Sequence, residues 1–387
     1  FFLTGMVFAI VGPTLLAISD SFGISEAEAG LLFPAQQFGY LAVVLASGAL
    51  SDIIGQRTVS RCGIGLMVAA LVGFALAPVW ALAIVLMVCV GIGFGAAEVT
   101  MNAAVADAHA QRRGRALNLI HLFFGIGALA APAAVALFSV WDTSWRLYYA
   151  GMAAYGLLPI ALFTRATFFQ RPRAEHPPVM RTFGRVLRRR RFVMISAMLG
   201  MAVGALGTVS TWFFAYLVQF RDRSESYAGM ALSLFWVGFV VGRIVSTSIV
   251  ERTGYRPLIL VSGIGGGVTV LLTLLTASEV LQPVGLVLTG VFFAPFYATI
   301  LALGQRSFPQ STGLVSGMII MVGALGGAFF PWLAGQLSEW ASLRYSVLLS
   351  GVLPLGIAAL AGAVLLEDWR KSGVDSPPHV PTGPRSG

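Results

Sequence analysis

The sequence predicts an all-α polytopic membrane protein, with twelve transmembrane helices arranged as two pseudo-symmetric six-helix bundles. Of its 387 residues, 57% are hydrophobic and only 11% are charged, against about 25% charged residues in soluble domains. Apolar runs long enough to span a bilayer recur along the chain. They lack the two-residue alternation of a β-barrel, so we expect the spans to be helices. The second half also repeats the glycine and proline spacing of the first.

Twelve apolar runs have about the 18 to 25 residues that a helix needs to cross a ~30 Å hydrocarbon layer. In chain order they cover residues 2–19, 29–50, 59–77, 81–106, 116–138, 147–166, 192–220, 228–250, 258–277, 283–305, 313–335 and 345–366.

Basic residues predict how these runs are oriented. Of the 25 lysines and arginines, Arg243 lies inside a run, and Arg146, Arg221, Arg223 and Arg344 fall on one side. The other 20 fall on the opposite side, which the positive-inside rule places in the cytoplasm. We therefore expect a multi-pass protein of the plasma (inner) membrane with both termini cytoplasmic. This topology explains the net charge of +9 without a nucleic-acid partner, so the expected partners of this monomer are lipid and a small-molecule substrate.

A single ungapped offset of 199 positions aligns the second half with the first. It pairs Gly39 with Gly238, Gly55 with Gly254, Arg57 with Arg256, Gly91 with Gly290, and Pro132 with Pro331. We expect parallel repeats related by an axis along the membrane normal, which can rock about a central site. The predicted bundles are residues 1–166 and 192–366, with a basic cytoplasmic linker at 167–191 and a cytoplasmic tail at 367–387.

Glu98 is the one carboxylate inside the fourth run. It precedes Asp107 by nine residues, which puts it ~13 Å into the bilayer at ~1.5 Å of rise per residue. An ionised carboxylate at that depth is costly, so it must be paired, hydrated or protonated. We expect Glu98 to bind and release a coupling proton. His121 in the next run lies at a comparable depth, where it either relays the proton or is a packed residue bonded to a carbonyl.

The loop after the second run reads GALSDIIGQRTVSR, and its counterpart in the second half reads VERTGYRP. The first resembles the signature of the major facilitator superfamily, in which a glycine and an aspartate precede a glycine and a basic residue. The resemblance implies the major facilitator fold and a cytoplasmic latch that holds the outward-open state; an ordinary solvated turn is the alternative. The gating residues would be Asp52, Arg57, Arg61, Glu251 and Arg256.

Arg243 is a further gating candidate. It precedes Glu251 by eight residues and so lies ~12 Å inside at ~1.5 Å per residue, close to the depth of Glu98. One hypothesis is that Arg243 and Glu98 exchange partners during the cycle. The alternative is a static role, in which Arg243 bonds carbonyls or reaches to the cytoplasmic face.

Three short runs narrow the resemblance: Glu98 followed by Asn102, then RALNLIHLFFGIGALAAP, and SLFWVGFVVGR. They look like the fucose permease-like branch of sugar/cation symporters. This resemblance implies that Glu98, Asn102, Asn118 and His121 bind sugar and couple protons. The first run lacks the acidic residue that fucose permeases carry there, so neither fucose itself nor a two-carboxylate relay is implied.

Other polar and aromatic residues within the runs are candidates for the substrate cavity. Amides bond hydroxyl groups and aromatic faces stack on the C–H face of a sugar, although each aromatic could equally have a packing role. Tyr297 is the counterpart of Glu98 at the repeat offset. The candidates are Gln36, Gln37, Tyr40, Trp212, Trp236 and Tyr297.

The sequence has no phosphate-binding P-loop, no His/Cys metal cluster and no nucleophile with a recognisable base, so we expect no enzyme, metal or cofactor site. It predicts a secondary active transporter that carries out proton-coupled symport of a sugar or similar small polar solute by alternating access. Sodium is the alternative coupling ion. A drug/proton antiporter of the same fold is one rival, although GALAAPAAVA in the fifth run lacks the glycines that follow the proline in the antiporter motif. A non-transporting receptor or scaffold is the other rival.

Overall fold

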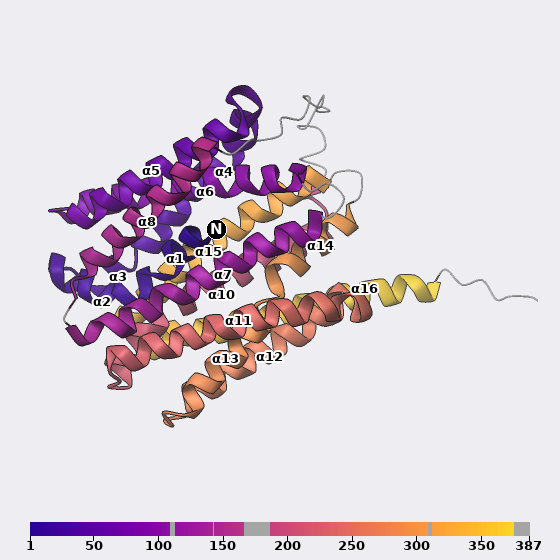
Figure 1. Ribbon diagram of the computed structural model, residues 1–387. Helices are drawn as coiled ribbons and strands as arrows, with labels where there is room; N and C mark the ends of the chain where they lie inside the picture. Colours follow the sequence, from indigo (N-terminus) through magenta and orange to yellow (C-terminus); the bar gives the residue numbers. More distant parts are fainter. Residues whose placement is uncertain (109–112, 142, 166–185, 309–311, 375–387) are drawn as a thin grey trace, which may run out of the picture.

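The computed structural model describes residues 1–108, 113–141, 143–165, 186–308 and 312–374, and every regular element within these ranges is a helix (Figure 1). The first half contains α1 (Phe2–Ala9), α2 (Val11–Phe22), α3 (Glu26–Ala29), α4 (Leu32–Ile54), α5 (Gln56–Leu76), α6 (Trp80–Ala108), α7 (Arg113–Phe138), η2 (Ser139–Trp141) and α8 (Trp145–Arg165). The second half contains α10 (Arg190–Ala215), η3 (Tyr216–Phe220), α11 (Glu225–Thr253), α12 (Tyr255–Leu275), α13 (Leu281–Phe293), α14 (Phe296–Ser307), α15 (Thr312–Trp340) and α16 (Leu343–Val374).

Each of the twelve predicted runs is occupied by one helix or by two consecutive helices. Within the described ranges, nine spans are long and apolar enough to cross a membrane, or ten when the bent pair α1 and α2 counts as one. Helices α4 and α8 occupy the second and sixth runs. The predicted fold class of an all-α polytopic membrane protein is therefore confirmed, and the helices are consistent with twelve spans.

Two of the runs predicted as single spans are interrupted, each at a proline. Helices α1 and α2 meet at 49°. Pro13 has no backbone N–H, and its ring crowds the carbonyl four residues earlier, which is that of Ala9, the last residue of α1. Pro295 likewise separates α13 from α14.

The last helix continues past the predicted end at residue 366. Glu367 forms an ion pair with Arg190 on α10, with 3.3 Å between the charged atoms, and the helix runs on to Val374. The rest of the predicted tail, and most of the predicted linker at 167–191, lie outside the described residues.

The repeat is visible in how the helices pack. Helix α4 packs against α6 as α11 packs against α13. A Cβ added at Gly39 would lie 2.0 Å from the Val88 carbonyl oxygen, and one added at its counterpart Gly238 would lie 2.0 Å from that of Val287. Only glycine permits backbones to approach so closely, as is common between membrane helices. The offset of 199 therefore relates contacts as well as residues.

The junctions that follow α4 and α11 are also equivalent. Gly55 joins α4 to α5 with φ of 86°, and Gly254 joins α11 to α12 with φ of 80°. A side chain at either position would be strained, because positive φ brings Cβ against the backbone.

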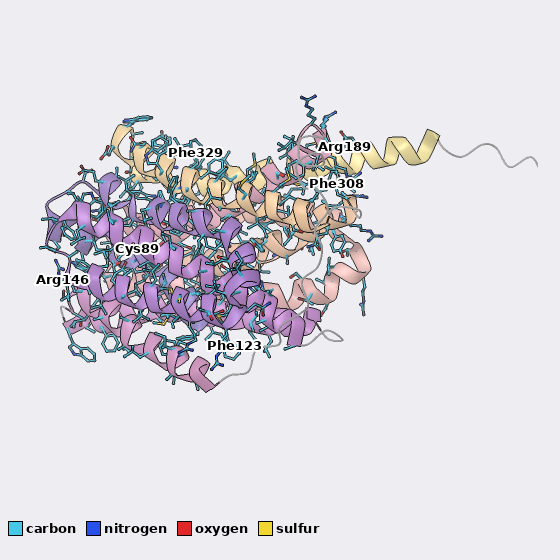
Figure 2. The ribbon with its side chains drawn as sticks, turned by 90° about the horizontal axis from the view of Figure 1, so that it is seen from above. Cys89, Phe123, Arg146, Arg189, Phe308 and Phe329 are labelled. Carbon is cyan, nitrogen blue, oxygen red and sulfur yellow. The ribbon has the colours of Figure 1, made fainter. Side chains whose placement is uncertain are left out.

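The two halves meet through α7 against α11 and through α4 against α15. At the offset of 199, α4 corresponds to α11 and α7 corresponds to α15. The contact of α7 with α11 is therefore equivalent to the contact of α15 with α4. Helices α4, α5, α6 and α8 lie on one side of the molecule and α11, α12, α13 and α16 on the other (Figure 1). In the perpendicular view, Arg146 lies at one end of the bundle, whereas Arg189 and Phe308 lie at the other end with the free end of α16 (Figure 2). We call the Arg146 end the outer end, after the orientation predicted from the basic residues.

Candidate transport cavity

A cavity of about 110 Å³ lies between the two halves, and both halves contribute side chains to it. Its polar lining consists of Gln37, Tyr40, Glu98, His121, Arg243 and Tyr297. Its apolar lining consists of Phe8, Phe94, Phe124, Val203, Leu206, Phe239, Ile320 and Ala324.

Glu98 reaches this cavity from α6, one helical turn beyond Phe94. The hydroxyl of Tyr40 on α4 donates a hydrogen bond to its carboxylate. The Tyr40 ring packs on Phe94, with 5.5 Å between ring centroids. Glu98 is therefore a partly exposed carboxylate with a protein donor, in an otherwise largely aromatic wall.

Arg243 faces the same cavity from the other half. It lies one turn beyond Phe239 on α11, and its guanidinium carbon lies 5.1 Å from the centroid of that ring. Its Nε atom is buried without a hydrogen-bond partner. Among the described residues no ion pair joins Arg243 to Glu98, so the two charges share the cavity without meeting in this conformation.

His121 lies on α7 and also lines the cavity. Its ring packs edge-on against that of Phe1, with 5.1 Å between centroids. It is close enough to Arg243 for the two side chains to interact electrostatically. Tyr297 on α14 interacts in the same way with both Glu98 and Arg243. The ionisable side chains of the lining therefore form one electrostatically connected set.

The repeat relates three pairs of residues in this lining. Adding 199 to Tyr40, Glu98 and His121 gives Phe239, Tyr297 and Ile320, and all six residues line the cavity. Residues such as Phe239 and Ile320 were not predicted from their chemistry, but applying the offset to Tyr40 and His121 would have found them. Phe8, Phe94 and Phe124 were missed because nothing distinguishes them from other phenylalanines in apolar helices.

Several predicted cavity residues lie elsewhere. Trp236 is fully buried behind the lining, with its ring against those of Phe8 and Phe239 at centroid distances of 6.1 and 5.2 Å. Gln36 is fully buried, and its amide has no hydrogen-bond partner. Asn102 is half-buried on α6 outside the lining, and the Asn118 side chain lies outside the described part of the chain.

Trp212 does not reach the cavity but closes the outer end. Its indole N–H donates to the Pro331 carbonyl at 2.9 Å. Cβ atoms added at Gly30 and Gly335 would lie 2.5 and 2.9 Å from its ring, so the indole fills a notch that these glycines leave. Because Gly30 belongs to the first half and Trp212 to the second, the ring packs across the interface.

Other contacts between the halves lie at the same end. A Cβ at Gly12 would lie 1.9 Å from the Ser210 carbonyl oxygen, which brings α2 and α10 into backbone contact. Gln219 donates to the Glu26 carboxylate at 2.6 Å. The halves are therefore packed together at the outer end.

Arg243, one of the predicted gating residues, lies in the cavity, whereas the others lie at the end opposite Arg146, around Gly55 and Gly254. Arg57 and Arg256 both have interaction partners there, and Arg61 is exposed. The side chains of Asp52 and Glu251 lie outside the described residues, so the latch stays a prediction.

Two related helical halves around a shared central cavity define a polytopic membrane transporter. The chain belongs to the Major Facilitator Superfamily, whose family model matches residues 1–331 and 222–385. The resemblance seen in the loop motifs is thereby confirmed. Family and fold indicate a transporter rather than an enzyme.

Individual proteins resemble the chain along most of its length. The MFS-type transporter YfkL of Bacillus subtilis is 23% identical over 379 residues, which cover 93% of each chain. A D-xylose-proton symporter superposes with a TM-score of 0.76 at 16% identity, over 93% of this chain and 94% of the other. The fucose:proton symporter FucP of E. coli gives a TM-score of 0.64 at 20% identity, over 94% and 96%. At these identities the structures establish the shared fold.

Proposed function

We propose that this protein is a secondary active transporter that couples proton movement to the symport of a sugar or similar small polar solute. The observation that carries the proposal is the position of Glu98, whose carboxylate faces a cavity between the halves and accepts a hydrogen bond from Tyr40. A carboxyl group at the centre of an alternating-access pathway can take up a proton from one side of the membrane and release it to the other side. Two fold neighbours are named as sugar–proton symporters, which supports this choice of substrate class.

The proposed cycle uses the packing of the two halves. With the basic end in the cytoplasm and Arg146 outside, contacts such as those of Trp212 close the outer end in this conformation. In the outward-open state Glu98 is protonated before the solute binds. Rocking then exposes the cavity to the cytoplasm, where the proton and the solute leave. The protein acts as a monomer in this scheme, because both halves of the pathway belong to one chain.

Substitution Glu98→Gln tests the proposal in proteoliposomes. A glutamine keeps the size and hydrogen-bonding capacity of a protonated carboxyl but cannot release a proton. We expect loss of uptake against a gradient, with exchange of solute retained. Glu339→Gln on the exposed end of α15 is the matched control. Uphill uptake that survives in Glu98→Gln would disprove proton coupling through this residue, and dependence on sodium at constant pH would identify sodium as the coupling ion.

A drug/proton antiporter is the second candidate, favoured by the four phenylalanines in the lining: Phe8, Phe94, Phe124 and Phe239. Such a wall suits a large apolar cation. The two functions differ in the direction of the substrate relative to the proton, because a symporter moves both the same way and an antiporter moves them in opposite directions. Extrusion of lipophilic cations driven by an inward proton gradient would favour the antiporter.

A further inference from the structure

Arg243 is a charged group in the cavity that the proposed proton coupling does not use. The part of the chain described by the structure gives its guanidinium no ion pair and no hydrogen bond, only the ring of Phe239 and the electrostatic neighbours His121 and Tyr297. A guanidinium in a poorly hydrated site is costly to leave without a counter-ion. Its planar fork of donors matches the two oxygens of a carboxylate.

The side of the cavity formed by the first half carries an acidic group instead of a basic one. Glu98 lies there with its carboxylate bonded to Tyr40, and it is the carboxylate of the cavity lining. When Glu98 is ionised, the cavity contains one group of each sign. When Glu98 takes up a proton, its negative charge disappears and the Arg243 cation is left without compensation. Protonation of Glu98 therefore favours the binding of an anion at Arg243, and release of that proton disfavours it.

Every titratable or charged group that faces this pair bears on that linkage. Around Glu98 these groups are Tyr40 on α4 and Tyr297 on α14. Around Arg243 they are His121 on α7 and Tyr297. None of these neighbours is an acidic side chain that could replace Glu98 as the proton-controlled negative charge.

We propose that the transported solute is a small organic monocarboxylate, whose carboxylate binds Arg243 and whose carbon skeleton packs on the phenylalanines of the lining. This inference rests on the proposed function and names its substrate class. One arginine compensates one negative charge, which favours a monoanion over a phosphate ester. Because one proton enters with one monoanion, the transport step moves no net charge.

Matched pairs of compounds test this proposal on the purified full chain. Each pair differs in one group: D-galacturonate and D-galactose, glycerate and glycerol, benzoate and benzyl alcohol. Binding is measured by thermal shift at pH 5.5 and pH 8, and uptake is measured in proteoliposomes. The variants are Arg243→Gln and Arg243→Lys, with Arg344→Gln on the exposed start of α16 as the control. The thermal midpoint of each variant without ligand checks that it is folded.

The expected result is that at least one carboxylate stabilises the wild type more at pH 5.5 than at pH 8, while its neutral partner does not. Arg243→Gln should weaken that binding by about 10- to 100-fold, the effect of a hydrogen bond to a charged group, while Arg243→Lys retains part of it. Initial uptake should not change when a potassium diffusion potential is imposed.

Three outcomes would overturn the inference: no carboxylate binds, the neutral partners bind equally well, or Arg243→Gln binds the carboxylate as the wild type does. Proton-driven, Glu98-dependent uptake of a neutral partner would reject the monocarboxylate and leave the proposed function standing. Uptake of a carboxylate that needs Arg243 but not Glu98 would reject the proton coupling instead.

Discussion

The hydroxyl of Tyr40 on α4 donates a hydrogen bond to the carboxylate of Glu98 on α6, and both helices belong to the first half. The acidic group of the cavity is therefore held by its own bundle, while Arg243 approaches from the other bundle without pairing with it. Rocking of the halves can then change the distance between the two charges without breaking the bond that orients Glu98.

Substitution Tyr40→Phe should uncouple the transporter in part. It removes the hydroxyl and leaves the ring that packs on Phe94. A hydrogen bond to a charged group contributes about 1.5–3 kcal/mol, and here it favours the ionised carboxylate that forms when the proton leaves. We expect proton-driven uptake to fall by about tenfold or more, with exchange less affected. Tyr345→Phe at a residue 52% exposed is the control, and equal uptake by both variants would refute the role of this bond.

Substitution Gly39→Ala should destabilise the first half, and Gly238→Ala should destabilise the second half to a similar degree. Each added methyl would lie 2.0 Å from a carbonyl oxygen, so the helices must separate. Overpacking of this kind costs about 1–3 kcal/mol. The measurement is the thermal midpoint in detergent. At Gly151 nothing lies within 4 Å of an added Cβ, so Gly151→Ala should leave the midpoint unchanged or raise it.

Substitution Trp212→Ala should open the outer end. The indole fills the notch between Gly30 and Gly335 and donates to Pro331, and removing a buried tryptophan costs about 3–5 kcal/mol. Because the indole packs between the two halves, its removal should mainly destabilise the conformation in which the outer end is closed. The distribution of distances between spin labels on α3 and η3 should shift to longer values and become broader. Trp340→Ala, at a residue 73% exposed, should leave them as in the wild type.

A cross-link between residues 26 and 219 should block transport reversibly. The Gln219 amide lies 2.6 Å from the Glu26 carboxylate, so the two positions are adjacent when the outer end is closed. In a background with Cys62→Ser and Cys89→Ala, the pair Glu26→Cys and Gln219→Cys is treated with a short thiol-cleavable bis-methanethiosulfonate. We expect uptake to stop and to return after reduction. Normal uptake by the fully cross-linked protein would mean that this end does not open during transport.

The repeat offers a way to find site residues that chemistry alone does not single out. Glu98 was predictable because a carboxylate in a long apolar run is energetically costly and therefore indicates a functional role. Phe239 and Ile320 were not, since they are ordinary apolar residues until the offset relates them to Tyr40 and His121. Trp212 shows the reverse, because its indole suits a sugar site but the structure uses it to join the two halves at the outer end.

The sequence by itself determined that the chain is helical and membrane-spanning, where its twelve apolar runs lie, and that its halves are related by 199 positions. These properties follow from local composition and from the length that a bilayer requires. Only the tertiary structure decided which face of each helix meets the cavity. Helices such as α6 are apolar on every side, so hydrophobic periodicity does not indicate their rotation. That rotation is set by close backbone contacts such as Gly39 against Val88, which bring Glu98 and Arg243 into one cavity and turn Trp212 away from it.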